Sequence, residues 1–191
     1  QAVKPVLEEL GVGLWYPVQY EGLEESPNIF HTGACANQQV EPAVSWLLEN
    51  IGKRFYLLGS DYTFPHTVSK LIKIQLQQNE GHVVGEAYQP LGAKDFSSII
   101  ARIVRAKPDV VFNTLTGDSN IAFYRQFQAA GLSAKQIPVL AISVSETELK
   151  SIGNAATGHL SCWSYFQSLE TPENRRFVKC FKARYGSDRV T

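Results

Sequence analysis

The sequence predicts an α/β fold with a parallel sheet and helices on both faces. Short apolar runs alternate along the 191 residues with segments whose apolar side chains recur at helical spacing. Hydrophobic residues make up 44% of the chain, enough for a globular core, and no sequence repeat or glycine-rich linker interrupts the alternation. Because a repeated strand–helix order places helices between parallel strands, this pattern indicates an α/β class.

Seven apolar runs are expected to form the strands. They span residues 12–16, 29–31, 54–58, 82–88, 109–114, 138–142 and 159–163. Between them lie helical patterns, the first with its apolar residues on one face of residues 40–48.

Capping and stop residues define most of the helix ends. Asp95 and Ser119 each precede a helical pattern as candidate N-caps, and Gly81 and Gly131 each follow one. Residues 145–148, Ser-Glu-Thr-Glu, have the spacing of a capping box.

The last predicted helix begins at Thr171-Pro172-Glu173. It carries three apolar residues, Phe177, Cys180 and Phe181.

Composition excludes several classes of function. Lys plus Arg and Asp plus Glu both total 18, and no basic stripe predicts binding to nucleic acid. No apolar run approaches the roughly 20 residues that span a bilayer, so direct membrane insertion is not expected. The three cysteines, Cys35, Cys162 and Cys180, have no metal-site spacing and are interpreted as buried thiols.

No cofactor is predicted. The sequence has no phosphate-binding loop of the Walker type, and Gly11-Val12-Gly13 precedes a strand, which does not fit a dinucleotide-binding turn. The chain begins within an amphipathic helix without an initiator methionine and stops just after another helix. We therefore expect an internal fragment of a longer protein.

The most informative segment is 59–66, Gly-Ser-Asp-Tyr-Thr-Phe-Pro-His, between a strand and a helix with proline in its first turn. In open α/β sheets, ligands bind at the carboxyl ends of the strands. The strand ends carry aromatic, hydroxyl, amide and carboxylate groups that are expected to meet at one edge and form a small-molecule pocket. These ends are residues 16–20, 60–62, 115–118, 143–145 and 164–166.

Asp118 is the strongest single candidate for a ligand contact. Its carboxylate could cap the following helix, or it could accept hydrogen bonds from an amide or urea NH₂ group, because an ionised carboxylate is acceptor-only. Gln19 can donate and accept, and the hydroxyls of Tyr16 and Tyr62 can do either. No Arg or Lys falls in these strand-end segments, which argues against a ligand held by its carboxylate or phosphate.

Catalysis finds little support in the sequence. Ser60, Asp61 and His66 suggest a hydrolytic set, but they crowd one loop without a nucleophile elbow. The other three histidines are scattered, so no metal site is predicted.

Several motifs together resemble the urea-binding proteins of ABC transporters, and the resemblance covers essentially the whole chain. The wider group has the type I periplasmic-binding-protein fold, which includes cytosolic amide sensors and branched-chain amino-acid binders. The motifs that carry the resemblance lie at residues 16–24, 26–29, 37–39, 59–65, 112–120 and 165–174.

The resemblance implies two α/β lobes with a ligand in the cleft between them. Residues 1–50 would be part of lobe one, 51–164 nearly all of lobe two, and 165–191 the return toward lobe one. It also implies a solute-binding protein that delivers urea or a short-chain amide to the permease subunits of an ABC transporter. The location would be periplasmic or extracellular and lipid-anchored.

The resemblance also implies which residues hold the ligand. Val18-Gln19 and Phe64 depart from the amide-sensor pattern of Thr-Pro and a second tyrosine, and they look like the urea-transport branch. The implied contacts are Tyr16, Val18, Gln19, Tyr62, Phe64, Asp118 and Ser145.

Three alternatives stay open at this point. A cytosolic amide-sensing regulator would share the pocket, and a branched-chain amino-acid binder would need groups for an α-carboxylate and an α-ammonium. An enzyme of Rossmann-like architecture is the third, although the sequence lacks a nucleophile–base pair.

Overall fold

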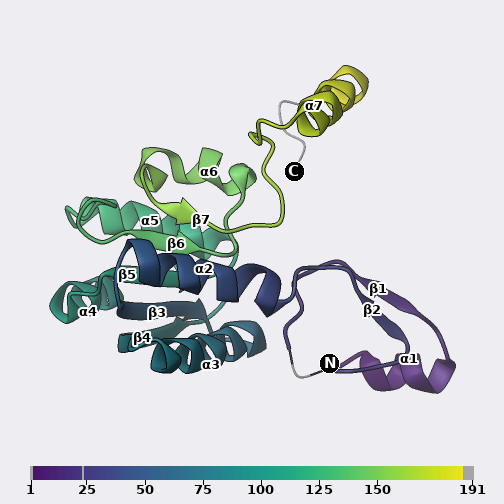
Figure 1. The fold of residues 1–191 in the computed structure, drawn as a ribbon, viewed down its shortest axis with the longest axis horizontal. Coiled ribbons are helices and arrows are strands. Elements are labelled where there is room, and N and C mark those ends of the chain that lie inside the picture. Colours follow the sequence, from purple (N-terminus) through teal and green to yellow (C-terminus); the bar gives the residue numbers. More distant parts are fainter. Residues whose placement is uncertain (1, 23, 187–191) are drawn as a thin grey trace.

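The computed structural model describes residues 2–22 and 24–186, and these residues form three parts (Figure 1). An α/β body comprises residues 36–161. A smaller unit, which we call the arm, comprises residues 2–22 and 24–31. Helix α7 (Pro172–Tyr185) forms the third part and, like the arm, projects from the body on the side where strand β3 ends.

The body is built on a five-stranded parallel sheet, which confirms the predicted fold class. The strand order is β4-β3-β5-β6-β7, so the first strand of the body in sequence lies between the edge strand β4 and the central strand β5. Each added strand is reached through a helix, as parallel pairing requires. The strands are β3 (Arg54–Ser60), β4 (His82–Gln89), β5 (Val110–Thr114), β6 (Val139–Ala141) and β7 (Leu160–Ser161).

Helices cover both faces of this sheet because its strands are apolar on both sides. Phe55 and Leu57 of β3 pack with α2 and α3, whereas Tyr56 and Leu58 face α4 and α5. All four side chains are buried. The helices of the body are α2 (Ala36–Asn50), α3 (Thr63–Gln78), α4 (Ser97–Ala106), α5 (Asp118–Ala129) and α6 (Glu146–Ile152), followed by the 3₁₀ turn η1 (Gly153–Ala156).

The capping predictions had mixed outcomes. The capping box is confirmed, because Ser145 Oγ accepts from the Thr147 amide and the Glu148 carboxylate accepts from the Ser145 amide at 2.8 Å. The prediction that Ser119 caps a helix was wrong. Helix α5 already begins at Asp118, after Gly117 at a φ of 63°, and Ser119 is buried inside the first turn.

The arm has its own small sheet. Strands β1 (Leu14–Tyr16) and β2 (Ile29–His31) pair in parallel, and α1 (Lys4–Leu10) packs beside them. We expected residues 16–20 to follow a strand of the main sheet, but they follow β1 of the separate two-stranded sheet. They reach the carboxyl edge of the main sheet from a separate unit.

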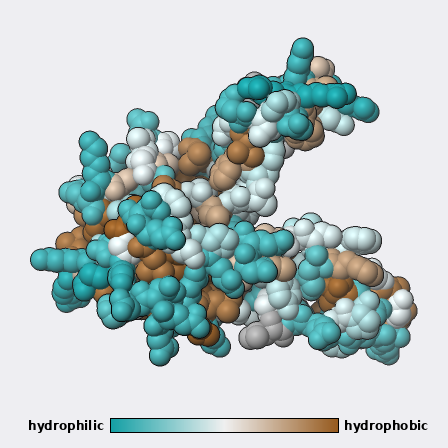
Figure 2. All heavy atoms as spheres, viewed as in Figure 1, coloured by the Kyte–Doolittle hydropathy of each residue, from teal (hydrophilic) through white to brown (hydrophobic). Residues whose placement is uncertain are grey.

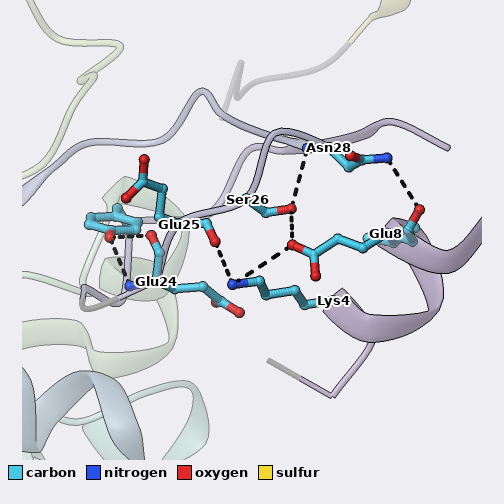
Figure 3. A network of polar contacts seen from close by, with 8 residues as sticks. Lys4, Glu8, Glu24, Glu25, Ser26 and Asn28 are labelled. Atoms are coloured by element: carbon cyan, nitrogen blue, oxygen red, sulfur yellow. Dashed lines mark hydrogen bonds and ion pairs between the residues drawn. The ribbon is translucent and has the colours of Figure 1, made fainter. Parts of the chain in front are cut away.

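Polar contacts hold α1 to the segment that precedes β2 (Figure 3). Ser26 Oγ donates to the Glu8 carboxylate at 2.8 Å, and Asn28 Nδ2 donates to the Leu7 carbonyl at 3.2 Å. The Lys4 ammonium donates to the Glu25 carbonyl. These bonds fix the arm as a unit, although their exposure makes each one worth little by itself.

The division between arm and body falls before α2. We assigned residues 1–50 to one lobe, but Val40, Val44 and Leu47 of α2 are buried in the same core as β3 and α3. Residues 32–35 form the first link between arm and body. Residues 162–171 form the second link, between the body and α7.

Apolar side chains remain uncovered on α7 and on the arm. Phe177, Tyr185 and Trp15 are 51%, 61% and 69% exposed. Figure 2 shows an open hollow between α7 and the arm. Cys180 is also exposed, so the expectation that all three thiols are buried was wrong.

A half-buried histidine makes the stability of the body depend on pH. His159 Nδ1 accepts from the Val139 amide at 3.0 Å, and the ring packs on Tyr124 and Phe127. Burial lowers the pKa of His159 to about 4. Because the unfolded chain binds this proton near pH 6.5, stability is full above that pH and falls as the pH drops toward 4.

We therefore expect that His159→Gln, which keeps an acceptor without titrating, reduces the loss of stability between pH 7 and pH 4. The difference is on the order of 2 kcal/mol, allowing for partial exposure of the ring. Calorimetric unfolding of both full-length proteins across this range measures it. Equal pH dependence in the two proteins would contradict the assignment.

Candidate functional site

Two tyrosines from different parts of the molecule share one region. Tyr16 ends β1 in the arm, and Tyr62 precedes α3 in the body, where its extended backbone turns the chain from β3 into the helix. Burial raises the pKa of Tyr16, and the charges of Glu21 and Tyr62 raise it further. Burial also raises the pKa of Tyr62, opposed by a hydrogen bond with Thr116 and reinforced by Glu21.

Glu21 lines a small cavity together with Tyr16, and its charge also acts on the Tyr62 phenol. Glu21 was not among the predicted contacts, because it follows Tyr20 in a loop whose position no periodicity predicts. The same loop touches the body at α3, since a Cβ on Gly22 would lie 2.9 Å from the Thr67 side chain. Gly22 has a φ of 85°, so the close approach and the backbone both favour glycine.

The loop after β5 is tied to the loop after β3. Thr116 Oγ1 and the Tyr62 hydroxyl lie 3.2 Å apart, and the Thr116 amide donates to Ser60 Oγ at 3.1 Å. Thr116 was not among the predicted site residues. These two bonds join the exits of adjacent strands and hold the Tyr62 ring in place.

A buried amide network shapes the loop that carries Asp118. Asn113 Nδ2 donates to Asn120 Oδ1 at 2.8 Å, and Asn120 Nδ2 donates to the Leu115 carbonyl at 2.9 Å. The Leu115 amide donates to Asn113 Oδ1 at 2.8 Å. Both asparagines are fully buried, so the turn from β5 into α5 is fixed by satisfied polar groups.

Asp118 is exposed as the first residue of α5. The helix has no side-chain cap, so the capping role considered for Asp118 was wrong. Within residues 2–22 and 24–186, no hydrogen bond or ion pair reaches this carboxylate. It therefore remains available as an acceptor two residues beyond Thr116.

Gln19 is already bonded within the protein. Its Nε2 donates to the Ile142 carbonyl at 2.9 Å and to Gln39 Oε1 at 3.2 Å. The Gln19 amide nitrogen is thus occupied, whereas its oxygen has no hydrogen-bond partner among the described residues. The Gln19 side chain could donate to a ligand or accept from it. Because its nitrogen is already bonded, only its oxygen remains to accept a hydrogen bond.

The remaining three predicted residues differ in their surroundings. Val18 is 54% exposed. Phe64 is only 5% exposed and packs in the core with its ring 6.4 Å from that of Tyr62, so it supports Tyr62 from behind. The Ser145 hydroxyl donates to the Glu148 carboxylate at 2.6 Å as part of the capping box. Ligand contacts by these three residues stay predictions.

The residues that suggested hydrolysis do not assemble a nucleophile and base. Ser60 is fully buried, and its hydroxyl accepts from the Thr116 amide. His66 pairs with Asp61 at 2.8 Å and stacks on Tyr88, with ring centroids 3.9 Å apart. Ser60 is therefore buried in the described chain, and the contact between the His66 and Tyr88 rings joins α3 to β4.

Two further features were searched for in residues 2–22 and 24–186. This part of the chain contains no cluster of three or more His, Cys, Asp or Glu side chains able to hold a metal ion. It also contains no helix that is both long and apolar enough to cross a bilayer.

The chain therefore combines a parallel α/β body with a second unit whose loop is held at the carboxyl ends of the strands of the body. The chain belongs to the family described as periplasmic binding protein domain, whose model matches residues 1–191.

The relatives are consistent with this family. A Leu/Ile/Val-binding protein homolog 6 from Brucella melitensis is 28% identical over 158 residues, which cover 81% of this chain and 40% of that protein. An ABC transporter substrate-binding protein from Sphaerobacter thermophilus is 30% identical, with a TM-score of 0.80 over 97% of this chain and 53% of that one. A solute-binding protein from R. palustris in complex with 4-hydroxybenzoate is 26% identical, with a TM-score of 0.82 over 97% of this chain and 52% of that one. The chain thus spans about half the length, or less, of these relatives.

Proposed function

We propose that the protein is a solute-binding component of an ABC transporter that takes urea or a short-chain amide. It would deliver the ligand to the permease subunits from the periplasm or from a lipid-anchored extracellular position. Membership of the periplasmic binding protein family supports the transport role. The preference for a neutral ligand rests on the charges around the two tyrosines.

One observation carries the choice of ligand. The charged groups at the site, Glu21 and Asp118, are both acidic, and Asp118 has no partner in the described chain. None of residues 16–22, 60–64, 115–118 and 142–145 is Lys or Arg. A carboxylate ligand would meet repulsion there, whereas an NH₂ group would find acceptors.

Closure of arm and body around the ligand provides the mechanism. Tyr16 and Tyr62 would contact the ligand from the two parts, while Asp118 and the Gln19 oxygen accept its N–H groups. Closing the site without matching donors would bury unpaired acceptors at a cost of about 1–3 kcal/mol each. A matching ligand therefore shifts the population toward the closed form, and a ligand without N–H donors does not.

An amino-acid or aromatic-acid ligand is the second candidate. The name of the Brucella relative and the 4-hydroxybenzoate in the R. palustris structure favour it. Such a ligand would need a cationic or N–H-rich group for its carboxylate, supplied by a part of the protein outside this chain. A cytosolic amide sensor would share the pocket but act on a regulatory partner.

Calorimetric titration of the full-length protein with urea, acetamide, leucine and 4-hydroxybenzoate tests the proposal. We expect saturable binding of urea or acetamide and none of leucine or 4-hydroxybenzoate. Binding of only leucine or 4-hydroxybenzoate would overturn the neutral-ligand proposal and leave the transport role standing with a different cargo.

A further inference from the structure

Gln39 occupies the point where the arm loop, α2 and the second link meet. It lies in the first turn of α2, directly after the first link, and its side chain is only 4% exposed. None of the motifs considered for the ligand includes it as a contact. Its burial and its bonding partners give it a different role.

Every hydrogen-bonding group of the Gln39 amide is used. Its Nε2 donates to the Ile142 carbonyl at 3.0 Å and to the Cys162 carbonyl at 2.6 Å. Its Oε1 accepts from Gln19 Nε2 at 3.2 Å. One side chain thus joins the end of β6, the start of the second link and the arm loop, by which we mean residues 17–22 after β1.

Backbone segments also lie close together around Gln39, at the junction of arm and body that we call the joint. The Tyr20 amide donates to the Ala34 carbonyl at 3.0 Å, which pairs the arm loop with the first link. A Cβ on Gly33 would lie only 2.0 Å from the Val18 carbonyl oxygen. The Cys162 amide donates to the Ala141 carbonyl at 2.9 Å.

A cavity of about 310 Å³ opens beside the joint. The arm loop and both links line it. Thr32 and Gly33 belong to the first link, and Trp163 and Ser164 belong to the second. The amide network of Gln39 thus lies at the wall of a cavity that both links line.

From this geometry we propose that Gln39 is a positioning residue: it fixes the Gln19 side chain and the relative placement of arm and body. In this role Gln39 does not touch the ligand. It holds Gln19 Nε2 so that the oxygen of the same amide points to the site, and it anchors the second link at Cys162. The effect on ligand affinity rests on the proposed function, whereas the effect on the links does not.

The first test needs no ligand. Gln39→Met keeps the length of the side chain and removes all three hydrogen bonds, and Gln128→Met on the exposed face of α5 is the matched control. Hydrogen exchange of the ligand-free full-length protein should become about tenfold faster at the Tyr20 and Cys162 amides, with β3 unchanged. Unchanged exchange at both amides would overturn the proposal. Faster exchange in β3 as well would reveal general loss of stability and would also overturn it.

The second test is a double-mutant cycle on urea affinity with Gln19→Ala and Gln39→Met. We expect Gln39→Met to weaken urea binding about three- to tenfold in the parent protein and to have little effect when Gln19 is already alanine. Additive effects would show that Gln39 does not act through Gln19 and would overturn the positioning role. If the parent protein does not bind urea, the proposed ligand fails, and the exchange experiment alone decides the role of Gln39.

Discussion

Replacing Asn120 by alanine is expected to lower the free energy of unfolding by about 2–4 kcal/mol. The change leaves Asn113 Nδ2 and the Leu115 carbonyl without their partners in a fully buried region. An unpaired buried polar group costs far more than its hydrogen bond contributes when made, because water cannot replace the missing partner. Calorimetric unfolding of the full-length protein measures the loss.

The adjacent residue provides a matched control. The Ser119 hydroxyl is buried without a hydrogen-bond partner among the described residues, so Ser119→Ala removes an unsatisfied group. We expect this variant to be neutral or slightly more stable. Similar losses for Ser119→Ala and Asn120→Ala would show that the first turn of α5 responds to side-chain volume and would contradict the role of the amide network.

Replacing Asp118 by alanine is expected to weaken urea binding at least about tenfold, or 1.4 kcal/mol. Like the Gln19 oxygen, the Asp118 carboxylate has no competing partner in the described chain, and its hydrogen bonds to N–H donors are in addition charge-assisted. Because Asp118 is exposed and caps nothing, the thermal unfolding midpoint should hardly change. Calorimetric titration and thermal unfolding of the same samples measure both quantities.

Glu49→Ala serves as the control for this prediction. It removes the same charge from the exposed face of α2, near the helix end remote from the arm. Its affinity for urea should equal that of the parent protein. Asp118→Asn should bind weakly, since half of the amide presents donors where the ligand also presents donors. Unchanged affinity for urea in both Asp118 variants would show that the Asp118 carboxylate does not bind the ligand.

Much of the body could be predicted from the sequence. The apolar runs at 54–58, 82–88 and 109–114 became β3, β4 and β5 with ends shifted by one or two residues, because buried parallel strands are apolar on both faces. The capping box at Ser145 could also be predicted, since Ser145 and Glu148 bond to each other across three residues of the chain. Elements whose determining contacts lie close together in the sequence are therefore the ones that could be predicted.

The site was less predictable because its contacts are distant in sequence. Tyr16 and Tyr62 were correctly placed at strand ends, but Tyr16 reaches the region from a separate two-stranded sheet. Glu21, Thr116 and Gln39 lay in segments that the sequence singled out, but no local pattern predicted their individual contacts. The bond from Gln39 to Cys162 spans 123 residues. The cap expected at Ser119 was wrong because the helix begins at Asp118, after Gly117, which is two residues earlier than a Ser119 cap requires.

The central claim is that arm and body close on a neutral, N–H-rich ligand held by Asp118. A crystal structure of the full-length protein with urea bound tests it most directly. The account predicts a urea nitrogen within hydrogen-bond distance of the Asp118 carboxylate, with Tyr16 and Tyr62 in contact with the ligand on either side. Urea bound away from Asp118, or a copurified carboxylate held at this site by a cationic side chain, would contradict it.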